Sequence, residues 1–240
     1  MSVLLVREDR EYLVEPGEEL GTDLGVLTVP DDPEPGTTLE THLGETFRVR
    51  RLRGPDLFHH LERTGAPMLP RDVGLVIGET GVAAGDRVLD AGTGTGVLAA
   101  YLGRLDAEVV TYERDPEFAE TARENMRLAG VADRIDVRAG DLTEHLGDLG
   151  GFDVLTLDTE DAPVIVEHAP DLLVDGGAVA VYVPFVETTR EVVEAARTAD
   201  LENVRAEETI QRELDVDERG TRPSTKGVGH TGYLVFARNQ

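Results

Sequence analysis

Apolar and polar positions follow two different periods along this chain. Over residues 1–65, short runs of alternating apolar and polar residues are separated by turns rich in proline, glycine and acids, which predicts a small β-rich domain or β-barrel. The strands expected here are Ser2–Arg7, Glu11–Val14, Gly25–Val29 and Thr46–Leu52. A helix expected at Asp56–Glu62 leads out of this domain.

From about Pro70 onward, apolar strands alternate with amphipathic helices, the pattern of a doubly wound parallel sheet. The expected strands are Arg87–Ala91, Glu108–Glu113, Ile135–Ala139, Phe152–Asp158 and Ala178–Pro184. The expected helices are Val73–Thr80, Gly96–Leu105, Pro116–Ala129, Ala162–Leu173 and Glu187–Ala199. Two more strands, near Asn203–Leu214 and at Gly232–Arg238, follow without a helix between them, which predicts a closing antiparallel hairpin. The sequence thus predicts an α/β, Rossmann-like domain over residues 66–240 after the β-rich domain.

The charge of the chain is strongly acidic. It carries 48 acidic and 23 basic residues, a formal net charge of −25, and Lys226 is its single lysine. Such a surface repels itself in dilute salt, whereas salt near 1 M screens charges within roughly 3 Å. Disorder is excluded because apolar residues make up 40% of the chain and are strongly periodic. We interpret the charge as that of a protein from a halophile, and therefore not as evidence against a nucleic-acid partner.

Several function classes find no support in the composition. The chain lacks cysteine, which excludes disulfides and thiolate metal sites, and its six histidines show no metal-binding spacing. No apolar run approaches the roughly 18 residues of a membrane span, and the N-terminus has no signal-peptide pattern. We therefore expect a cytoplasmic protein with no membrane segment and no bound metal.

One expected strand ends in an acid and turns through three alternating glycines before the next helix. This turn comprises Asp90, Ala91, Gly92, Thr93, Gly94, Thr95 and Gly96. Glycine permits the tight turn and lets a nucleoside-bearing cofactor approach the backbone, as in nicotinamide, flavin and S-adenosylmethionine (SAM) sites. The Gly-x-Gly-x-Gly spacing differs from the turn that holds a pyrophosphate, and Asp90 would repel a pyrophosphate but suits a cationic ligand. These details favour SAM, with a nicotinamide enzyme as the alternative.

Acids also lie at or just after the ends of the next three expected strands, and carboxyl ends of parallel strands share one edge of a sheet. Glu113 lies 21 residues after Gly92, where a carboxylate can accept hydrogen bonds from both ribose hydroxyls. Asp141 can accept from the adenine amino group, and Asp158 ends the fourth strand. The predicted SAM site comprises Asp90, Gly92, Thr93, Gly94, Gly96, Glu113 and Asp141. The two threonines of the turn, Thr93 and Thr95, are interpreted as turn residues and not as catalysts.

The glycine-rich turn resembles motif I of the class I SAM-dependent methyltransferases. Two further stretches, Gly229–Arg238 and Glu62–Asp72, resemble the closing strand and the pre-catalytic segment of the TrmI/Trm61-type tRNA (adenine-N1)-methyltransferases. This resemblance implies SAM as cofactor, tRNA as partner, a homotetramer, and methyl transfer to N1 of a T-loop adenine, at position 58 with or without position 57. It also implies a β-rich N-terminal domain and a class I sheet with the antiparallel ending.

The chain departs from that family at several positions. Leu69 and Arg71 stand where the family usually has Tyr and Lys, and the residues after Asp158, including Thr159 and Glu160, do not follow its Pro-x-Pro pattern. The stretch Met68–Arg71 is also similar to the protein isoaspartyl methyltransferases, which lack the tail around His230 and form the first alternative. The second alternative is a non-catalytic tRNA-binding paralogue, which would be expected to lose some of the acids and glycines that this chain retains.

The substrate candidates follow from the chemistry that the resemblance implies. Asp158 is the predicted catalytic residue, because a carboxylate there can accept from the adenine amine and oppose the positive charge that develops on the ring. Tyr182 is either a base-stacking residue or a core aromatic, and Phe185 and Tyr233 are the other aromatics to examine for stacking. His230 lies in the active cleft or anchors the last strand.

A cluster of arginines is the predicted contact with tRNA phosphates. Its members are Arg48, Arg50, Arg51 and Arg53. On a strand, the first two would share one face and the last two the other. The alternative interpretation is a structural strand whose arginines pair with neighbouring acids.

Overall fold

The computed structural model describes residues 2–226 and 229–240. The chain divides into two compact units. The first comprises Met1–Val73, Ala83–Gly85 and Thr93–Gly140, and the second comprises Gly74–Val82, Asp86–Gly92 and Asp141–Gln240. The domain boundary expected after residue 65 stays a prediction.

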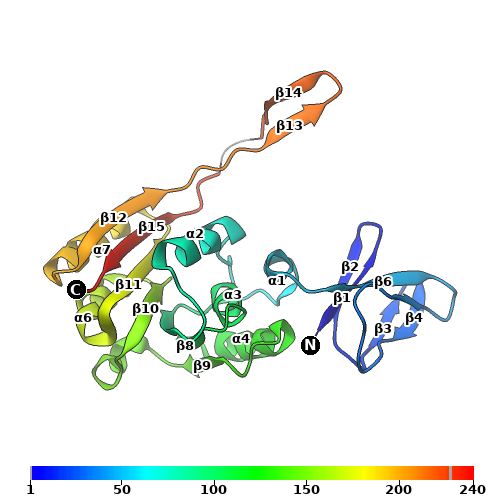
Figure 1. Cartoon of the computed structure of the whole chain (residues 1–240), viewed down its shortest axis with the longest axis horizontal. Coiled ribbons are helices and arrows are strands. Elements are labelled where there is room, and N and C mark those ends of the chain that lie inside the picture. The colour runs from blue at the N-terminus through cyan, green and yellow to red at the C-terminus, as the bar shows by residue number, and fades with distance from the viewer. Residues whose placement is uncertain (1, 227–228) are drawn as a thin grey trace. The chain divides into compact units, whose positions relative to one another are not determined.

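The N-terminal part is β-rich, as expected, and consists of two open sheets (Figure 1). A four-stranded sheet has the order β2-β1-β6-β5, with β1 at Val3–Arg7, β2 at Arg10–Val14, β5 at Thr38–Glu40 and β6 at Thr46–Arg51. A two-stranded sheet pairs β3 (Glu19–Thr22) with β4 (Gly25–Thr28). One apolar cluster, which includes Leu5, Leu27 and Phe47, draws residues from both sheets. The sequence pattern missed β3 and β5 because these short strands bury little apolar surface.

A seven-stranded sheet has the order β12-β15-β11-β10-β7-β8-β9. Its strands are β7 (Arg87–Ala91), β8 (Glu108–Glu113), β9 (Ile135–Ala139), β10 (Phe152–Leu157), β11 (Leu173–Val183), β12 (Glu202–Glu208) and β15 (Tyr233–Arg238). Strand β10 is parallel to β7 and β11, and β8 is parallel to β9, whereas β15 is antiparallel to both β11 and β12. This mixed sheet confirms the predicted Rossmann-like fold with an antiparallel ending.

The helices lie close to the expected positions. They are α1 (Gly54–His60), α2 (Pro70–Thr80), α3 (Val97–Gly103), α4 (Pro116–Ala129), α5 (Ala162–Glu167), α6 (Ala169–Leu172) and α7 (Val186–Thr198), with 3₁₀ turns η1 (Leu142–Glu144) and η2 (Leu146–Asp148). Helix α4 has the expected bounds because Asp115 caps its first N–H groups and Gly130, with φ at 73°, ends it. The single helix expected over Ala162–Leu173 is wrong: α5 ends at Glu167, and Pro170, which has no N–H to donate, lies in the first turn of α6.

The C-terminal strands differ from the expectation in one respect. Strand β12 ends at Glu208, and a hairpin of β13 (Leu214–Asp217) and β14 (Gly220–Pro223) comes before β15. Figure 1 shows this hairpin, in orange, extending beyond the ends of β12 and β15. The sequence pattern missed it because every residue of β14 is exposed. No helix in the described part of the chain is long and apolar enough to cross a bilayer.

Candidate cofactor and substrate site

The ends of β7 and β10 meet at Gly92. The Asp158 N–H donates to the Ala91 carbonyl at 2.8 Å, which extends the pairing of the two strands by one residue. The Asp158 carbonyl lies against Gly92 so closely that a Cβ atom on Gly92 would be 2.0 Å from its oxygen. Gly92 also has φ at 89°, in the left-handed region. Glycine is therefore required here for its backbone conformation and for the close approach of Asp158.

Two carboxylates lie near this junction in different surroundings. Asp90 is 4% exposed, and its Oδ1 accepts from the Thr156 hydroxyl at 2.5 Å. The Asp158 side chain reaches solvent, yet the protein around it removes much of its hydration. This desolvation, and secondly the charge of Asp90, raises the pKa of Asp158 to about 7. Two acids held this close would favour a cationic ligand or a hydrogen-bond donor beside them.

The glycine-rich turn itself is held by Glu113. Gly94 N–H donates to Glu113 Oε2 at 2.9 Å, and Asp115 N–H donates to Oε1 at 3.1 Å. A carboxylate has about four acceptor positions, so Glu113 keeps the capacity for the ribose hydroxyls that the sequence assigns to it. Thr93 is buried and shares a 2.5 Å hydrogen bond with the hydroxyl of Thr111, which fits its interpretation as a turn residue.

Helix α3 follows the last glycine of this turn. Gly96 has φ at 78° and acts as the N-terminal cap residue of the helix. A Cβ atom at Gly96 would lie 2.5 Å from the Met126 side chain of α4. The left-handed backbone favours glycine here, and the contact with the flexible end of Met126 adds a smaller packing reason; both are separate from any ligand.

Asn125 of α4 is a site residue that the sequence reasoning missed. It is fully buried, and its Nδ2 donates to the carbonyls of Glu62 and Thr95, each at 2.9 Å. Its Oδ1 accepts the Glu62 N–H at 3.0 Å, and Thr64 N–H donates to Thr95 Oγ1 at 3.3 Å. Residues 62–64 are thus fixed on the glycine-rich turn. The signal available in the sequence was an amide on the apolar face of α4, three residues after Ala122.

Asp141 lies directly after Gly140, which follows β9 in the chain. Its side chain caps η1: Oδ1 accepts from the N–H of Thr143 at 2.8 Å and from its hydroxyl at 2.7 Å. The assignment of Asp141 to the adenine amino group stays a prediction.

The tail residue His230 connects two segments of the second unit. Its Nδ1 lies 2.9 Å from Glu208 Oε1, and its Nε2 lies 3.0 Å from the Pro184 carbonyl oxygen. Both partners are acceptors, so the hydrogen bond to Pro184 and then the one to Glu208 raise the pKa of His230. Of the two roles left open by the sequence, this geometry favours the anchor.

The ring of Tyr182 packs against the backbone near His230. A Cβ atom at Gly232 would be 2.4 Å from Tyr182 Cζ, so the ring covers this glycine. The side chain is partly buried. This contact favours the interpretation of Tyr182 as a core aromatic over its interpretation as a base-stacking residue.

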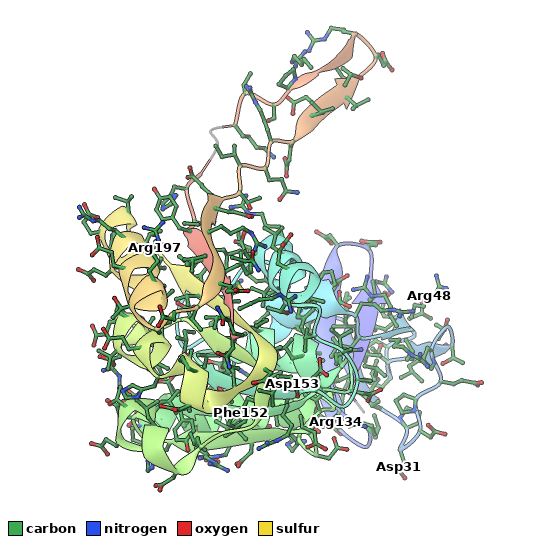
Figure 2. All side chains as sticks on the ribbon, turned by 60° about the vertical axis from the view of Figure 1, so that its left-hand side comes forward. Asp31, Arg48, Arg134, Phe152, Asp153 and Arg197 are labelled. Atoms are coloured by element: carbon green, nitrogen blue, oxygen red, sulfur yellow. The ribbon has the colours of Figure 1, made fainter. Side chains whose placement is uncertain are left out.

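The four predicted tRNA-contacting arginines have different surroundings. Arg48 and Arg50 share the exposed face of β6, as expected, and Figure 2 shows Arg48 on the outside of this sheet. Arg50 pairs with Glu11 and Asp56, each at 2.9 Å. The expectation that Arg51 and Arg53 share the other face is wrong, because β6 ends at Arg51 and Arg53 caps α1.

No acidic partner within the described residues neutralises the other three arginines, Arg48, Arg51 and Arg53. A further arginine, Arg104, donates from Nη2 to the Leu52 carbonyl at 2.7 Å. Leu52 lies between Arg51 and Arg53 in the sequence. Burial, and then the charges of Arg53 and Arg51, lower the pKa of Arg104. No group of three metal-ligating side chains was found within the described ranges 2–226 and 229–240.

Comparison with a solved structure places this architecture in a class. The chain superimposes on a SAM-dependent O-methyltransferase from Thermotoga maritima with a TM-score of 0.82 and 27% identity, covering 99% of this chain and 92% of the other. A seven-stranded sheet with an antiparallel ending, and a glycine-rich turn after its first parallel strand, define a class I SAM-dependent methyltransferase.

Sequence comparison narrows the class to a family. The family described as tRNA methyltransferase complex GCD14 subunit matches residues 57–221. The chain is 33% identical to the tRNA (adenine(57)-N(1)/adenine(58)-N(1))-methyltransferase TrmI of Methanocaldococcus jannaschii, over 98% of this chain and 94% of that protein. It is 30% identical to the tRNA (adenine(58)-N(1))-methyltransferase TrmI of Thermus thermophilus, over 97% and 94%. The chain belongs to the TrmI-type tRNA (adenine-N1)-methyltransferases, which confirms the predicted family.

A protein-L-isoaspartate O-methyltransferase of Methanoculleus marisnigri is 42% identical, but over only 92 residues. That match covers 38% of this chain and 41% of the other protein. It is a partial likeness, whereas the likeness to the TrmI proteins extends over nearly the whole chain.

Proposed function

We propose that this protein transfers the methyl group of SAM to N1 of a T-loop adenine in tRNA, at position 58 and also at position 57. Both named TrmI relatives act on adenine 58, and the more similar of the two also acts on adenine 57. The observation that carries the proposal is Asp158, held against Gly92 at the end of β10 and beside the buried Asp90.

The cofactor is assigned to the residues that the sequence predicted. They are Asp90, Gly92, Thr93, Gly94, Gly96, Glu113 and Asp141. The glycines leave room at the backbone, Glu113 offers acceptor positions for ribose hydroxyls, and Asp90 supplies a negative charge that attracts a cation. Bound SAM supplies a methyl group that is already activated by a positively charged sulfur.

Asp158 is assigned to the target base. Adenine N1 is a neutral nucleophile, so catalysis needs little beyond placing N1 in line with the methyl group, which can supply about 7–11 kcal/mol. The Asp158 carboxylate would accept a hydrogen bond from the exocyclic amine. This contact orients the ring and opposes the positive charge that forms on it. A T-loop adenine must leave its stack to reach this acid, at a cost of a few kcal/mol.

The tRNA backbone is assigned to Arg48, Arg51 and Arg53, which form no ion pair with the residues that the structure describes. Arg50 is less suited, because Glu11 and Asp56 already neutralise it. Arg51 and Arg53 also lie near enough to the half-buried Arg104 to lower its pKa. In a chain of net charge −25, three cations that lie near one another in the sequence and have no acidic partner among the described residues favour an anion such as a phosphate.

A homotetramer is the proposed assembly, as the family resemblance implies. The hairpin β13–β14 supports subunit contact through this surface, because Leu214 and Val216 share one face of it and are 60% and 75% exposed. A tRNA substrate also fits the cytoplasmic location that the sequence predicts.

The experiment that tests the proposal uses SAM labelled at the methyl group, an unmodified tRNA transcript and multimolar potassium chloride. Nucleoside analysis should find N1-methyladenosine. A transcript with guanosine at position 58, and another with guanosine at position 57, assign the label to its position. Label in aged protein but not in tRNA would instead identify an isoaspartyl methyltransferase. SAM binding without transfer to either substrate would identify a non-catalytic paralogue.

A further inference from the structure

Phe185 has a solvent-exposed aromatic ring, and hydrogen bonds hold the backbone on either side of it. It lies between β11 and α7, and its side chain is 66% exposed. Its carbonyl accepts from the N–H of Thr189 at 3.0 Å and from the Thr189 hydroxyl at 2.9 Å. The preceding carbonyl, of Pro184, is the partner of His230. The hydrogen bonds on both sides hold the backbone that carries the exposed ring.

The ring lies on the same edge of the sheet as Asp158. Strands β10 and β11 are parallel neighbours, and Leu157 pairs with Val181 in their register. Asp158 follows Leu157 directly, and Phe185 comes four residues after Val181. Both residues therefore belong to the carboxyl ends of adjacent strands, where open α/β sheets bind their ligands.

The other aromatic candidates near this edge are covered by protein. Tyr182 packs on Gly232, and the Tyr233 ring lies 4.8 Å from the ring of His230, measured between centroids. Both side chains are partly buried. Among these three aromatics, Phe185 alone offers an open face.

We propose that Phe185 is a stacking platform for a nucleobase of the substrate RNA beside Asp158, and that His230 is the residue that positions it. This inference rests on the proposed tRNA function. RNA loops are recognised through unstacked bases that lie on aromatic rings, and stacking does not depend on charge. It therefore suits an acidic protein in concentrated salt, where phosphate contacts weaken steeply.

The test measures binding of unmodified tRNA in the presence of S-adenosylhomocysteine, and binding of SAM separately. Phe185→Ala should weaken tRNA binding about 10- to 100-fold, because each base–aromatic stack contributes about that much. Phe185→Trp should bind within about threefold of the wild type, since it keeps an aromatic face. Val186→Ala is the matched control: Val186 is 58% exposed next to Phe185 but is not aromatic, and its loss should leave tRNA binding unchanged. SAM affinity should be the same in all variants.

His230→Ala should also lower tRNA affinity, as Phe185→Ala does. In His230→Gln the amide can still donate to the Pro184 carbonyl, so this variant should keep part of the affinity that His230→Ala loses. Equal tRNA affinity of Phe185→Ala and wild type would overturn the inference while leaving the proposed function intact. So would equal losses for the Ala and Trp variants, or a change of oligomeric state in Phe185→Ala, which would assign the ring to a second copy of the chain. A wild-type protein that neither binds nor methylates tRNA would instead defeat the proposed function.

Discussion

Asp158 is subject to two opposing requirements. Desolvation and the neighbouring Asp90 favour its neutral form and raise its pKa to about 7. The proposed role at the adenine, which is to accept from its amine and to oppose the positive charge on the ring, is served best by the charged form. The proposed catalytic form is therefore the one that the surroundings of Asp158 disfavour, as at many functional sites.

We expect Asp158→Ala to lower kcat by roughly 10²- to 10⁴-fold, the range for a positioned polar catalyst, while SAM affinity stays nearly unchanged. Single-turnover methylation of tRNA and calorimetry with SAM would measure the two effects. A collapse of SAM affinity would make Asp158 a cofactor ligand.

The pH dependence of the wild type follows from the same residue. Because the proposed active form is the carboxylate, kcat/KM for SAM should fall as the pH drops below about 7. Because SAM affinity is expected not to depend on Asp158, linkage requires the fall in kcat to lie at nearly the same pH. Rate profiles between pH 5.5 and 9 would reveal both inflections. A profile without an inflection would show that ionisation of Asp158 does not control the rate.

The same pKa predicts a stability effect. The folded-state pKa of Asp158 is raised above its ordinary value, so the stability from this group is present at low pH and is lost as the pH rises through about 7. Asp158→Asn removes this loss. The melting temperature of this variant minus that of the wild type should therefore be more positive at pH 8 than at pH 5, as scanning calorimetry would show. A pH-independent difference would contradict the raised pKa.

At the scale of elements, the glycine-rich turn depends on a helix far from it in the chain. Asn125→Ala would leave the N–H and carbonyl of Glu62 and the carbonyl of Thr95 without their partner. We expect a loss of roughly 2–4 kcal/mol in the free energy of unfolding, together with weaker SAM binding. Val137→Ala, in a buried position of β9, is the control: it should lose stability but keep SAM affinity. Equal SAM affinity in both variants would limit Asn125 to a structural role.

Strand β6 and the start of α1 offer a matched comparison between arginines. Replacing Arg48, Arg51 and Arg53 together by Gln should weaken tRNA binding and reduce its logarithmic salt dependence by about one per lost phosphate contact. Arg50→Gln should leave tRNA binding nearly unchanged and cost about 1 kcal/mol of stability, because its ion pairs are partly exposed. Salt titrations of tRNA affinity separate the two cases. If the triple variant binds like the wild type, these arginines are structural.

The elements that the sequence predicted well are those with a strong internal pattern. Helix α4 has an acidic cap, a first-turn proline and a C-terminal glycine, so its bounds follow from local chemistry. The acids of the candidate site were found because each lies at or just after the carboxyl end of an apolar strand. Strands β13 and β14 lacked such a pattern, since they bury almost nothing. The contact of Asn125 with Glu62 joins residues 63 positions apart, and no local rule predicts it.

At the scale of the whole molecule, the net charge of −25 sets the conditions for assembly. Charges act over about 10 Å in 0.1 M salt but over only about 3 Å in 1 M salt. Any contact between copies brings acids together, and the hairpin β13–β14 carries Asp215 and Asp217 beside its exposed valine. The proposed homotetramer should therefore be stable in concentrated salt and dissociate as the salt is diluted.

Val216→Asp tests whether the hairpin holds the copies together. Val216 is 75% exposed, so the change costs the single chain little, whereas a buried intermolecular contact would gain an unpaired charge among other acids. We expect this variant to dissociate in molar salt, where the wild type stays assembled, with unchanged SAM binding. Val164→Asp on α5, where the valine is 49% exposed, is the matched control and should keep the wild-type mass. Sedimentation velocity would measure all three proteins, and a Val216→Asp protein of wild-type mass would assign the interface to another surface.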